Sequence, residues 1–453
     1  MPSSPLTLES LAADLAARRT TSRALVDACL ARIDEPGGQG TVAFLHIDRD
    51  AARRAADAMD ALREANAEPS RFAGIPIAIK DLFDVQRQVT RAGSTALDGA
   101  PAAADAPAVE RLRRAGFILI GRTNMSEFAF SGLGLNPHFG TPLSPWNRHE
   151  GRIAGGSTSG GAVAVADLMA HGALGTDTGG SCRIPAAFCG LVGFKPTASR
   201  IPRAGAVPLS TTLDSVGSIA RSVTCCETID AILAGQSEPA AAVVTVTGLR
   251  FAAPQNYVLD SVDAAVAAAL GAAIAALERA GAVVDAVTIP ELDGIPTINA
   301  KGGFAAAESY AWHRTLMETR SGLYDPRVIV RIRRGAEQSA ADLLDLLQAR
   351  AALIDGVMKR LAGYDAMLLP TTPTVPPRLD ACGDDAEYGR LNLLALRNPT
   401  VINMIDGCAV SLPVHERGGP PIGLMLAACH DQDMRLLRIA CAVERLLDRD
   451  RSS

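Results

Sequence analysis

Residues 175–185 read Gly-Thr-Asp-Thr-Gly-Gly-Ser-Cys-Arg-Ile-Pro, a polar stretch in which Ser181 follows two glycines. Glycine lets the backbone come close to a ligand where a side chain would block it. Backbone N–H groups beside such a serine can converge on the oxyanion that forms when a carbonyl is attacked. The stretch is no G-x-S-x-G nucleophile elbow, because Arg183 stands where the final glycine of that motif belongs. Ser181 is therefore a candidate nucleophile of another class.

A second glycine-rich stretch lies upstream. Residues 155–161 read Gly-Gly-Ser-Thr-Ser-Gly-Gly and place three hydroxyls directly before a helix that we expect over Ala162–Ala170. Because a helix start supplies free N–H groups, one interpretation is a cradle for an anion. A set of hydroxyls placed for proton relay is the second interpretation, and a tight capped turn is the third. No Gly-Lys-Ser/Thr follows, so the stretch is not a P-loop.

Lys80 stands at the end of a strand that the run Ile75–Lys80 predicts, and only four of the 44 basic residues are lysines. Burial disfavours an ammonium, so a lysine in an apolar strand can be neutral near pH 7 and act as a base. The alternative is a solvated lysine that pairs with Asp81. No histidine lies in either serine stretch, so Lys80, acting through a second serine, is the candidate base for Ser181.

Five blocks of the chain, in this order, closely resemble the amidase signature family of serine hydrolases. They are GIPIAIKD at 74–81, GRTNMSEFA at 121–129, GGSTSGG at 155–161, GTDTGGSCRIPAAFCGLVGFKPT at 175–197 and YDAMLLPTTP at 364–373. The family uses a Ser-cisSer-Lys triad. The resemblance implies that Ser181 is the acyl nucleophile, Ser157 the serine held by a cis peptide bond, and Lys80 the terminal base.

The resemblance also implies supporting roles. The oxyanion hole would be formed by the backbone N–H groups of Thr178, Gly179, Gly180 and Ser181. Ser159, Asp177 and Arg183 match positions that support this site. Two residues depart from the family pattern: Thr158 stands where many relatives carry serine, and Cys182 stands where an aliphatic residue is common. Both fit sterically. No metal and no organic cofactor is implied.

The fold that the resemblance implies is α/β: a single amidase-signature domain over residues 1–453, with a central mixed β-sheet flanked by helices. Its core would cover about 70–230, residues 236–345 would form a variable helical and strand region at the substrate pocket, and 364–453 would return to the core. The residues agree, because strands at Ile75–Lys80 and Gly116–Gly121 flank a helix at Pro107–Ala115, as in a buried α/β sheet. Eight glycines in 131–161 predict a long functional loop.

Periodicity and turn residues predict the remaining elements. We expect two helices over 7–34 with caps at Thr21 and Ser22, a helix over Arg49–Asn66, a loop over Gly175–Ser181, strands over Gly248–Ala253, Ala282–Ile289 and 366–369, and helices over about 305–361.

The substrate pocket is placed by the resemblance around Ala129 to Leu135, Gly303 to Arg334 and the loop after Pro373, with Ala129 and Ser131 as candidate substrate-binding residues. These stretches carry several large apolar side chains, namely Phe128, Phe130, Leu133, Leu135, Phe304, Tyr310 and Trp312. They favour an apolar or aryl amide over a small dianionic substrate. Ester and carbamate cleavage share the attack on a carbonyl and stay open.

Composition limits the class of partner. The 453 residues are 48% hydrophobic with a net charge of −5, so the whole chain offers no electrostatic footprint for nucleic acid or an anionic membrane. Nine cysteines lack zinc-ligand spacing and are expected to be reduced thiols. The first residues lack the pattern of a secretory signal, and the Ala-rich run Ala264–Leu277 is too short to span a membrane. We expect a cytoplasmic protein with a small-molecule substrate. The sequence does not fix the oligomeric state, and a homodimer is one alternative.

Three rival functions stay open. The glutaminase of the glutamyl-tRNA(Gln) amidotransferase carries the same blocks, works with partner subunits, and has a glutamine-binding arginine in the helical region where Arg350 falls. A non-catalytic homologue that binds a small ligand would be favoured by loss of Lys80, Ser157 or Ser181, and all three are present. A phosphate-binding enzyme is disfavoured because the glycine-rich loop lacks a Walker lysine.

Overall fold

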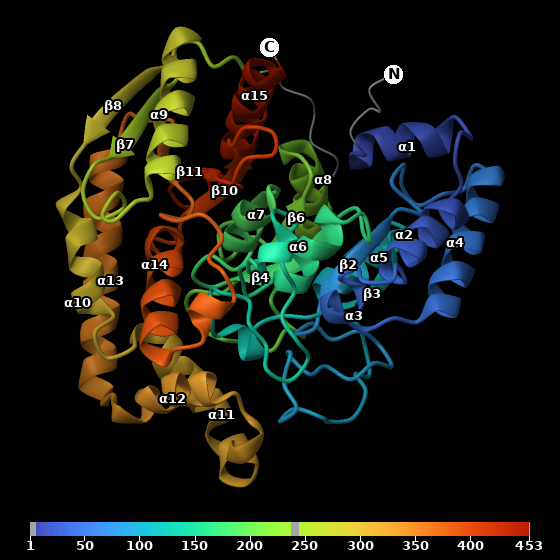
Figure 1. The fold of residues 1–453 in the computed structure, drawn as a ribbon, viewed down its shortest axis with the longest axis horizontal. Helices are drawn as coiled ribbons and strands as arrows, with labels where there is room; N and C mark the ends of the chain where they lie inside the picture. Colours follow the sequence, from blue (N-terminus) through green and yellow to red (C-terminus); the bar gives the residue numbers. More distant parts are fainter. Residues whose placement is uncertain (1–5, 237–243, 453) are drawn as a thin grey trace.

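The computed structural model describes residues 6–236 and 244–452, and its strands form one eleven-stranded mixed sheet in the order β1-β3-β2-β4-β6-β5-β10-β11-β9-β7-β8 (Figure 1). The strands are β1 (Phe44–His46), β2 (Pro76–Lys80), β3 (Ile118–Thr123), β4 (Ala173–Asp177), β5 (Val192–Lys195), β6 (Ser215–Ala220), β7 (Arg250–Pro254), β8 (Val283–Val287), β9 (Ala366–Pro370), β10 (Cys408–Pro413) and β11 (Gly423–Ala428).

Apart from the antiparallel pair of β1 and β3 at one edge, the pairing is parallel toward both ends of the sheet and antiparallel through its middle. β2 pairs in parallel with β3 and β4, and β7 pairs in parallel with β8 and β9. Parallel neighbours need a crossover, which the helices α5 (Pro107–Arg114) and α9 (Ala264–Arg279) supply. The strands from β4 to β9 along the sheet pair antiparallel. The predicted α/β fold with one central mixed sheet is confirmed.

Helices surround this sheet, and Figure 1 shows α1, α2 and α4 grouped at one end of the molecule and α10 and α13 at the other. Besides α5 and α9, the helices are α1 (Leu8–Ala16), α2 (Ser22–Ile33), α3 (Gly40–Ala43), α4 (Arg49–Glu64), α6 (Ser159–Ala166), α7 (Arg183–Cys189), α8 (Val223–Ala234), α10 (Ile295–Ile298), α11 (Gly303–Arg320), α12 (Pro326–Arg333), α13 (Ala340–Leu361), α14 (Asp385–Met404) and α15 (Asp433–Ser452).

Most of the elements expected from the sequence occur within a few residues of their predicted limits, and the differences lie near the serine stretches and at one cap. Thr21 caps α2 as predicted, by accepting a hydrogen bond from Ala24 N, whereas Ser22 is the first residue of the helix and not a second cap. The stretch Gly175–Ser181 is only partly a loop, because β4 continues to Asp177. The helix predicted to begin at Ala162 is α6, which begins at Ser159. Gly160 and Gly161 lie in the first turn of this helix. These shifts bring all three hydroxyls of residues 157–159 to a helix start.

Two properties of the described residues bear on membrane and metal binding. No helix within 6–236 and 244–452 has the length and apolar character needed to cross a lipid bilayer. In the same residues, no group of three His, Cys, Asp or Glu side chains is placed to hold a metal ion.

Candidate active site

The candidate site lies at one edge of the sheet, where two parallel strands end. β2 and β4 run side by side with Ala78 opposite Ala173 and Ile79 opposite Leu174. Because carboxyl ends of parallel strands meet at the same edge, Lys80 at the end of β2 comes next to the polar end of β4. All five residues of β2 are buried, and the side chain of Lys80 is not exposed to solvent.

Lys80 is fully buried at this edge of the sheet. Its Nζ donates to Oγ of Ser157 at 2.7 Å, to Oγ1 of Thr176 at 3.0 Å and to the carbonyl oxygen of Thr176 at 3.4 Å. Burial lowers the pKa of Lys80 to about 8, against the opposing effects of nearby Cys182 and Asp177. The amine therefore has a substantial neutral fraction near physiological pH.

Ser157 sits in the glycine-rich stretch before α6. The Gly156–Ser157 peptide bond is cis, and the side chain of Ser157 is fully buried. The loop is fixed on one side by Ser126, whose N–H donates to the Ser157 carbonyl at 3.1 Å. A Cβ on Gly156 would lie 2.5 Å from the backbone N of Gly134, so no larger residue fits at this crossing. Lys80 and Ser157, far apart in sequence, are thus brought into direct contact.

Ser181 lies on the neighbouring loop, between β4 and α7. Its carbonyl accepts a hydrogen bond from Thr158 N at 3.3 Å, which joins the two serine loops directly. Gly180 has φ 128°, and a Cβ there would lie 2.6 Å from Pro399, so glycine is required before the serine. The Ser181 side chain is 3% exposed and lines a cavity. The loop therefore presents Ser181 at the cavity wall.

The four amides that the resemblance predicts as an oxyanion hole are not equivalent. Gly180 N–H donates to Oδ1 of Asp177 at 2.8 Å and is already occupied. Within the described residues, the backbone N–H groups of Thr178, Gly179 and Ser181 have no hydrogen-bond acceptor. Thr178, Gly179 and Ser181 also line the cavity.

Asp177 holds the turn that carries Ser181. Its carboxylate accepts hydrogen bonds from Cys182 N at 3.0 Å and from both Nε and Nη2 of Arg183, at 3.0 and 2.7 Å. Both side chains of the Asp177–Arg183 pair are fully buried. Burial alone would raise the pKa of Asp177, yet the Arg183 guanidinium holds it well below its usual range. Asn403 on α14 donates to the same carboxylate at 3.1 Å, so a third segment of the chain supports the pair.

Ser159, the third predicted supporting residue, is buried in the first turn of α6. Among the described residues, its Oγ and the Oγ1 of Thr158 have no hydrogen-bond partner. Cys182, the second departure from the family pattern, is fully buried, and burial raises the pKa of its thiol to about 12. It is a packing residue with no thiolate at neutral pH.

Sequence reasoning missed two polar residues of the site, Thr176 and Asp214. Thr176 is the second acceptor for Lys80, and alternation along β4 carries no signal for it because every residue of that strand is buried. Asp214 lies more than thirty residues after Thr178 and accepts a hydrogen bond from its hydroxyl. Burial raises the pKa of Asp214 to about 6, although two backbone N–H groups also donate to it. Only the folded chain brings these groups together.

Ser181 opens into a cavity of about 900 Å³, the size of a small-molecule site. Ala129 and Ser131, the two residues predicted to contact substrate, both line it. Ser131 is held in place by Tyr388, whose hydroxyl donates to its Oγ at 2.8 Å. The adjoining wall is one face of α14, which contributes eight lining residues: Gly389, Arg390, Asn392, Leu393, Leu394, Leu396, Arg397 and Thr400.

The predicted aromatic wall is wrong for most of its members. Phe130 lines the cavity, but Phe128, Phe304, Tyr310 and Trp312 do not. Phe128 and Trp312 instead pack with His313 and Tyr324 in an aromatic cluster, with ring centroids 4.4 to 6.2 Å apart. Phe304 packs in the hydrophobic core beneath α13. Leu133 and Leu135 belong to another core cluster. These side chains stabilise the wall from behind, so they carry no argument for an aryl substrate.

The apolar part of the cavity comes from other residues, and its charge differs from the expectation. Leu209, Leu213, Ile295 and Leu396 form part of the lining. Four arginines, Arg331, Arg334, Arg390 and Arg397, also line it, whereas no aspartate or glutamate does among the described residues. No pattern in the sequence indicates this cluster, because its members come from two separate helical segments.

Arg350, the residue weighed for the glutaminase hypothesis, does not line the cavity. Its Nε donates to the carbonyl of Met404 at 3.0 Å and its Nη2 to that of Asn403 at 3.3 Å. These are carbonyls at the C-terminal end of α14. Arg350 therefore provides hydrogen bonds to the free carbonyl groups at this helix end.

The profile of the amidase family matches residues 24–437 of this chain. The chain belongs to the amidase family. It is 37% identical, over 99% of its own length and 97% of the relative, to a 2-amino-5-chloromuconic acid deaminase of Comamonas testosteroni. It is 31% identical, over 98% and 96%, to a glutamyl-tRNA(Gln) amidotransferase subunit of Anaeromyxobacter sp. (strain K).

Solved structures of the family agree with this assignment. A crystal structure of an amidase superposes with a TM-score of 0.88 at 31% identity, covering 97% of this chain and 99% of that one. The native peptide amidase of Stenotrophomonas maltophilia superposes with a TM-score of 0.81 at 25% identity, covering 99% and 98%. As an amidase-family member, the protein is an amidohydrolase that acts on C–N bonds of small substrates.

Proposed function

We propose that the protein hydrolyses the C–N bond of a small amide through an acyl-enzyme on Ser181, with Ser157 and Lys80 as the proton relay. The single observation that carries this proposal is the buried contact of 2.7 Å between Nζ of Lys80 and Oγ of Ser157, beside the cavity that Ser181 lines. The lowered pKa of Lys80, about 8, lets the amine accept a proton.

In the first half-reaction, the Ser181 hydroxyl attacks the substrate carbonyl. Its proton passes to Ser157 while the proton of Ser157 passes to neutral Lys80, so one new C–O bond forms and Lys80 becomes an ammonium. The backbone N–H groups of Thr178, Gly179 and Ser181 would donate to the oxyanion, each donor contributing roughly 3–4 kcal/mol to the transition state. Gly180 would support the turn through Asp177.

The tetrahedral intermediate then collapses, and the C–N bond breaks. The proton held by Lys80 returns through Ser157 to the leaving nitrogen, which departs as ammonia or an amine. Water takes its place, gives its proton to the same relay, and cleaves the acyl-enzyme to release the acid and free Ser181. Esters and carbamates would be cleaved by the same attack, because their carbonyls meet the same nucleophile.

A second candidate is the glutaminase of an amidotransferase, since relatives named as amidotransferase subunits cover nearly the whole chain. The position of Arg350 speaks against it, because this arginine is engaged by α14 and lies outside the cavity lining. The relative named as a deaminase of 2-amino-5-chloromuconic acid favours a free-standing enzyme that cleaves C–N bonds. Glutamine hydrolysis that rises on adding partner subunits and charged tRNA would reverse this order.

Reaction with a fluorophosphonate tests the proposal without knowledge of the substrate. We expect one phosphonyl group per chain, found by peptide mass mapping on Ser181, and none on the Ser181→Ala variant. Ser131→Ala is a matched control, because Ser131 lines the same cavity but would not be the nucleophile. A protein that stays unmodified, or an adduct on another serine, would overturn the proposed chemistry.

A further inference from the structure

The arginines of the cavity differ in how far they are already neutralised. Arg390 pairs with Glu387 at 2.7 Å. Arg331, Arg334 and Arg397 have no carboxylate within 4.0 Å among the described residues. The cavity thus holds three arginines without a direct ion pair, of which Arg397 feels the charge of Asp260 at longer range, in a chain whose net charge is −5.

These three guanidinium groups are held by backbone carbonyls, which fix their position without cancelling their charge. Arg331 donates to Phe130 O at 2.7 Å, and Arg334 donates to Ala300 O at 2.7 Å. Arg397 donates to Val258 O at 3.0 Å and to Asp260 O, and its guanidinium lies 6.0 Å from the ring of Tyr257.

Each guanidinium has N–H groups to spare. A guanidinium carries five N–H donors, of which Arg331 and Arg334 use one each and Arg397 uses three, one of them for Asn398. Donors remain on all three for a ligand. Arginine binds carboxylates in two-point geometry, and such charge-assisted bonds are about twice as strong as neutral ones.

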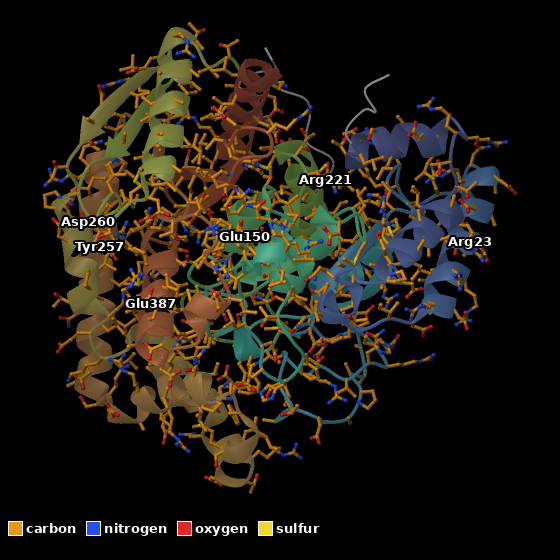
Figure 2. All side chains as sticks on the ribbon, in the orientation of Figure 1. Arg23, Glu150, Arg221, Tyr257, Asp260 and Glu387 are labelled. Carbon is orange, nitrogen blue, oxygen red and sulfur yellow. The ribbon has the colours of Figure 1, made fainter. Side chains whose placement is uncertain are left out.

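The arginines lie at two different positions along the axis of α14. Arg331 stacks at 5.0 Å on the ring of Tyr388, near the start of the helix, whereas Arg397 lies nine residues further on. At 1.5 Å per residue the two positions are about 13 Å apart. Figure 2 shows Glu387 on α14 and, to its left, Tyr257 and Asp260 on the segment after β7 that holds Arg397. The apolar residues of the cavity, Leu209 and Leu213 among them, can accept the uncharged body of a ligand.

From this arrangement we infer that the substrate is anionic: an amide with an apolar body and at least one carboxylate, which Arg397 on α14 and Arg331 and Arg334 on the facing segment bind. This inference rests on the proposed function, because it names the substrate class of the same cavity. It replaces the expectation of an uncharged aryl or apolar amide, whose aromatic wall lies outside the cavity. The three arginines orient the substrate and take no part in the proton relay.

Two anilides of equal length test this charge preference by calorimetry on the Ser181→Ala protein, which cannot turn them over in our proposal. The probes are N-phenylsuccinamate and N-phenylbutanamide, in which a methyl group replaces the carboxylate. We expect the carboxylate to bind about tenfold more tightly or better, as charge-assisted bonds in a partly dry cavity provide. Arg397→Gln and Arg334→Gln should each bring the two affinities toward equality.

Arg333→Gln is the matched control, because it removes one positive charge next to Arg334 from a residue that does not line the cavity. It should leave the preference for the carboxylate unchanged. If Arg397→Gln fails to fold, the Arg334→Gln variant tests the inference alone. It is expected to fold, since the Arg334 side chain is exposed and donates to one backbone carbonyl. Equal binding of the two probes, no binding of either, or a preference that survives both substitutions overturns the inference.

The two proposals fail separately in these experiments. A carboxylate preference together with an unreactive Ser181 would leave the anion site standing and remove the serine chemistry. Phosphonyl-Ser181 together with equal anilide affinities would keep the chemistry and remove the anion site.

Discussion

The end of β2 with the two glycine-rich serine loops, one before α6 and one after β4, and the cavity wall built mainly by α14 are adjacent in space but are encoded in different ways. The loops and the end of β2 hold Ser157, Ser181 and Lys80 in short motifs, where glycines allow close backbone crossings that few other sequences permit. The wall is one face of a helix packed against distant segments, and many sequences can form such a face. The chemistry of a site can therefore be anticipated from local sequence, whereas its selectivity depends on tertiary packing.

The largest effect expected on the loop side is from Ser181→Ala. Loss of the nucleophile should lower kcat by about 10⁴-fold or more while the thermal midpoint stays within a few degrees of wild type. Turnover of an activated ester or anilide, with circular dichroism to check the fold, measures both. A variant that keeps more than a few per cent of wild-type kcat would show that the motif does not carry the chemistry.

Lys80→Met should reduce kcat by about 10²–10⁴-fold, the range of a general base. Lys195→Met is a matched control, because Lys195 is the other fully buried lysine among the described residues and burial lowers its pKa to about 8 as well. Its Nζ donates to the carbonyls of Pro196 and Gly407 and to no serine. We expect Lys195→Met to lower the unfolding midpoint with a kcat near wild type. Equal losses of kcat in the two variants would show that Lys80 has a structural role and is not the general base.

Asp177→Asn tests the support of the serine turn. Removing one partner leaves the Arg183 charge buried and unpaired, which typically costs about 3–5 kcal/mol of stability. Chemical unfolding should show this loss, with a smaller fall in kcat because Asn keeps a single acceptor oxygen where Gly180 N–H and Cys182 N–H each donate to a different carboxylate oxygen. Unchanged stability would mean that the pair does not hold the turn.

The smallest effect is expected from Arg350→Gln. Since Arg350 binds carbonyls at the end of α14, its loss should cost about 1 kcal/mol of stability and change KM by less than about twofold. Steady-state kinetics with the best substrate found would measure this. A KM that rises tenfold or more would move Arg350 into substrate binding and bring back the glutaminase hypothesis.

The contrast between loops and wall also explains how much of the fold can be predicted. A strand such as Ile75–Lys80 is visible in the sequence, because β-branched residues recur there behind a glycine with no charge before the lysine. β4, β5 and β6 carry no such signal, because a glycine interrupts each of these short strands and β6 also contains two serines. A Cβ on Gly193 would lie 2.5 Å from the Cys182 carbonyl, so small residues are needed where the serine turn rests on the sheet.

On the wall, aromatic residues suggest substrate contact from the sequence, and packing places them elsewhere. Phe128 and Trp312 meet His313 and Tyr324 behind the cavity, where the buried ring of His313 forms a hydrogen bond of 2.9 Å with the Tyr324 hydroxyl. The arginines that do line the cavity resemble ordinary surface charges in a chain rich in arginine. Neither burial nor pairing can be read from spacing alone when the partners come from different helices.

The most direct measurement of the central claim is the pH dependence of the rate at which a fluorophosphonate modifies Ser181. Burial holds the pKa of Lys80 at about 8, below its usual value near 10.5, so the neutral amine that starts the relay disappears as pH falls. With Lys80 as the base, the rate should climb to a plateau with a midpoint near pH 8 and drop about a hundredfold by pH 6. The Lys80→Met variant should lose this pH dependence along with most of the rate. A rate that is flat between pH 5 and 9, or a Lys80→Met protein labelled as fast as wild type, would contradict this role of Lys80.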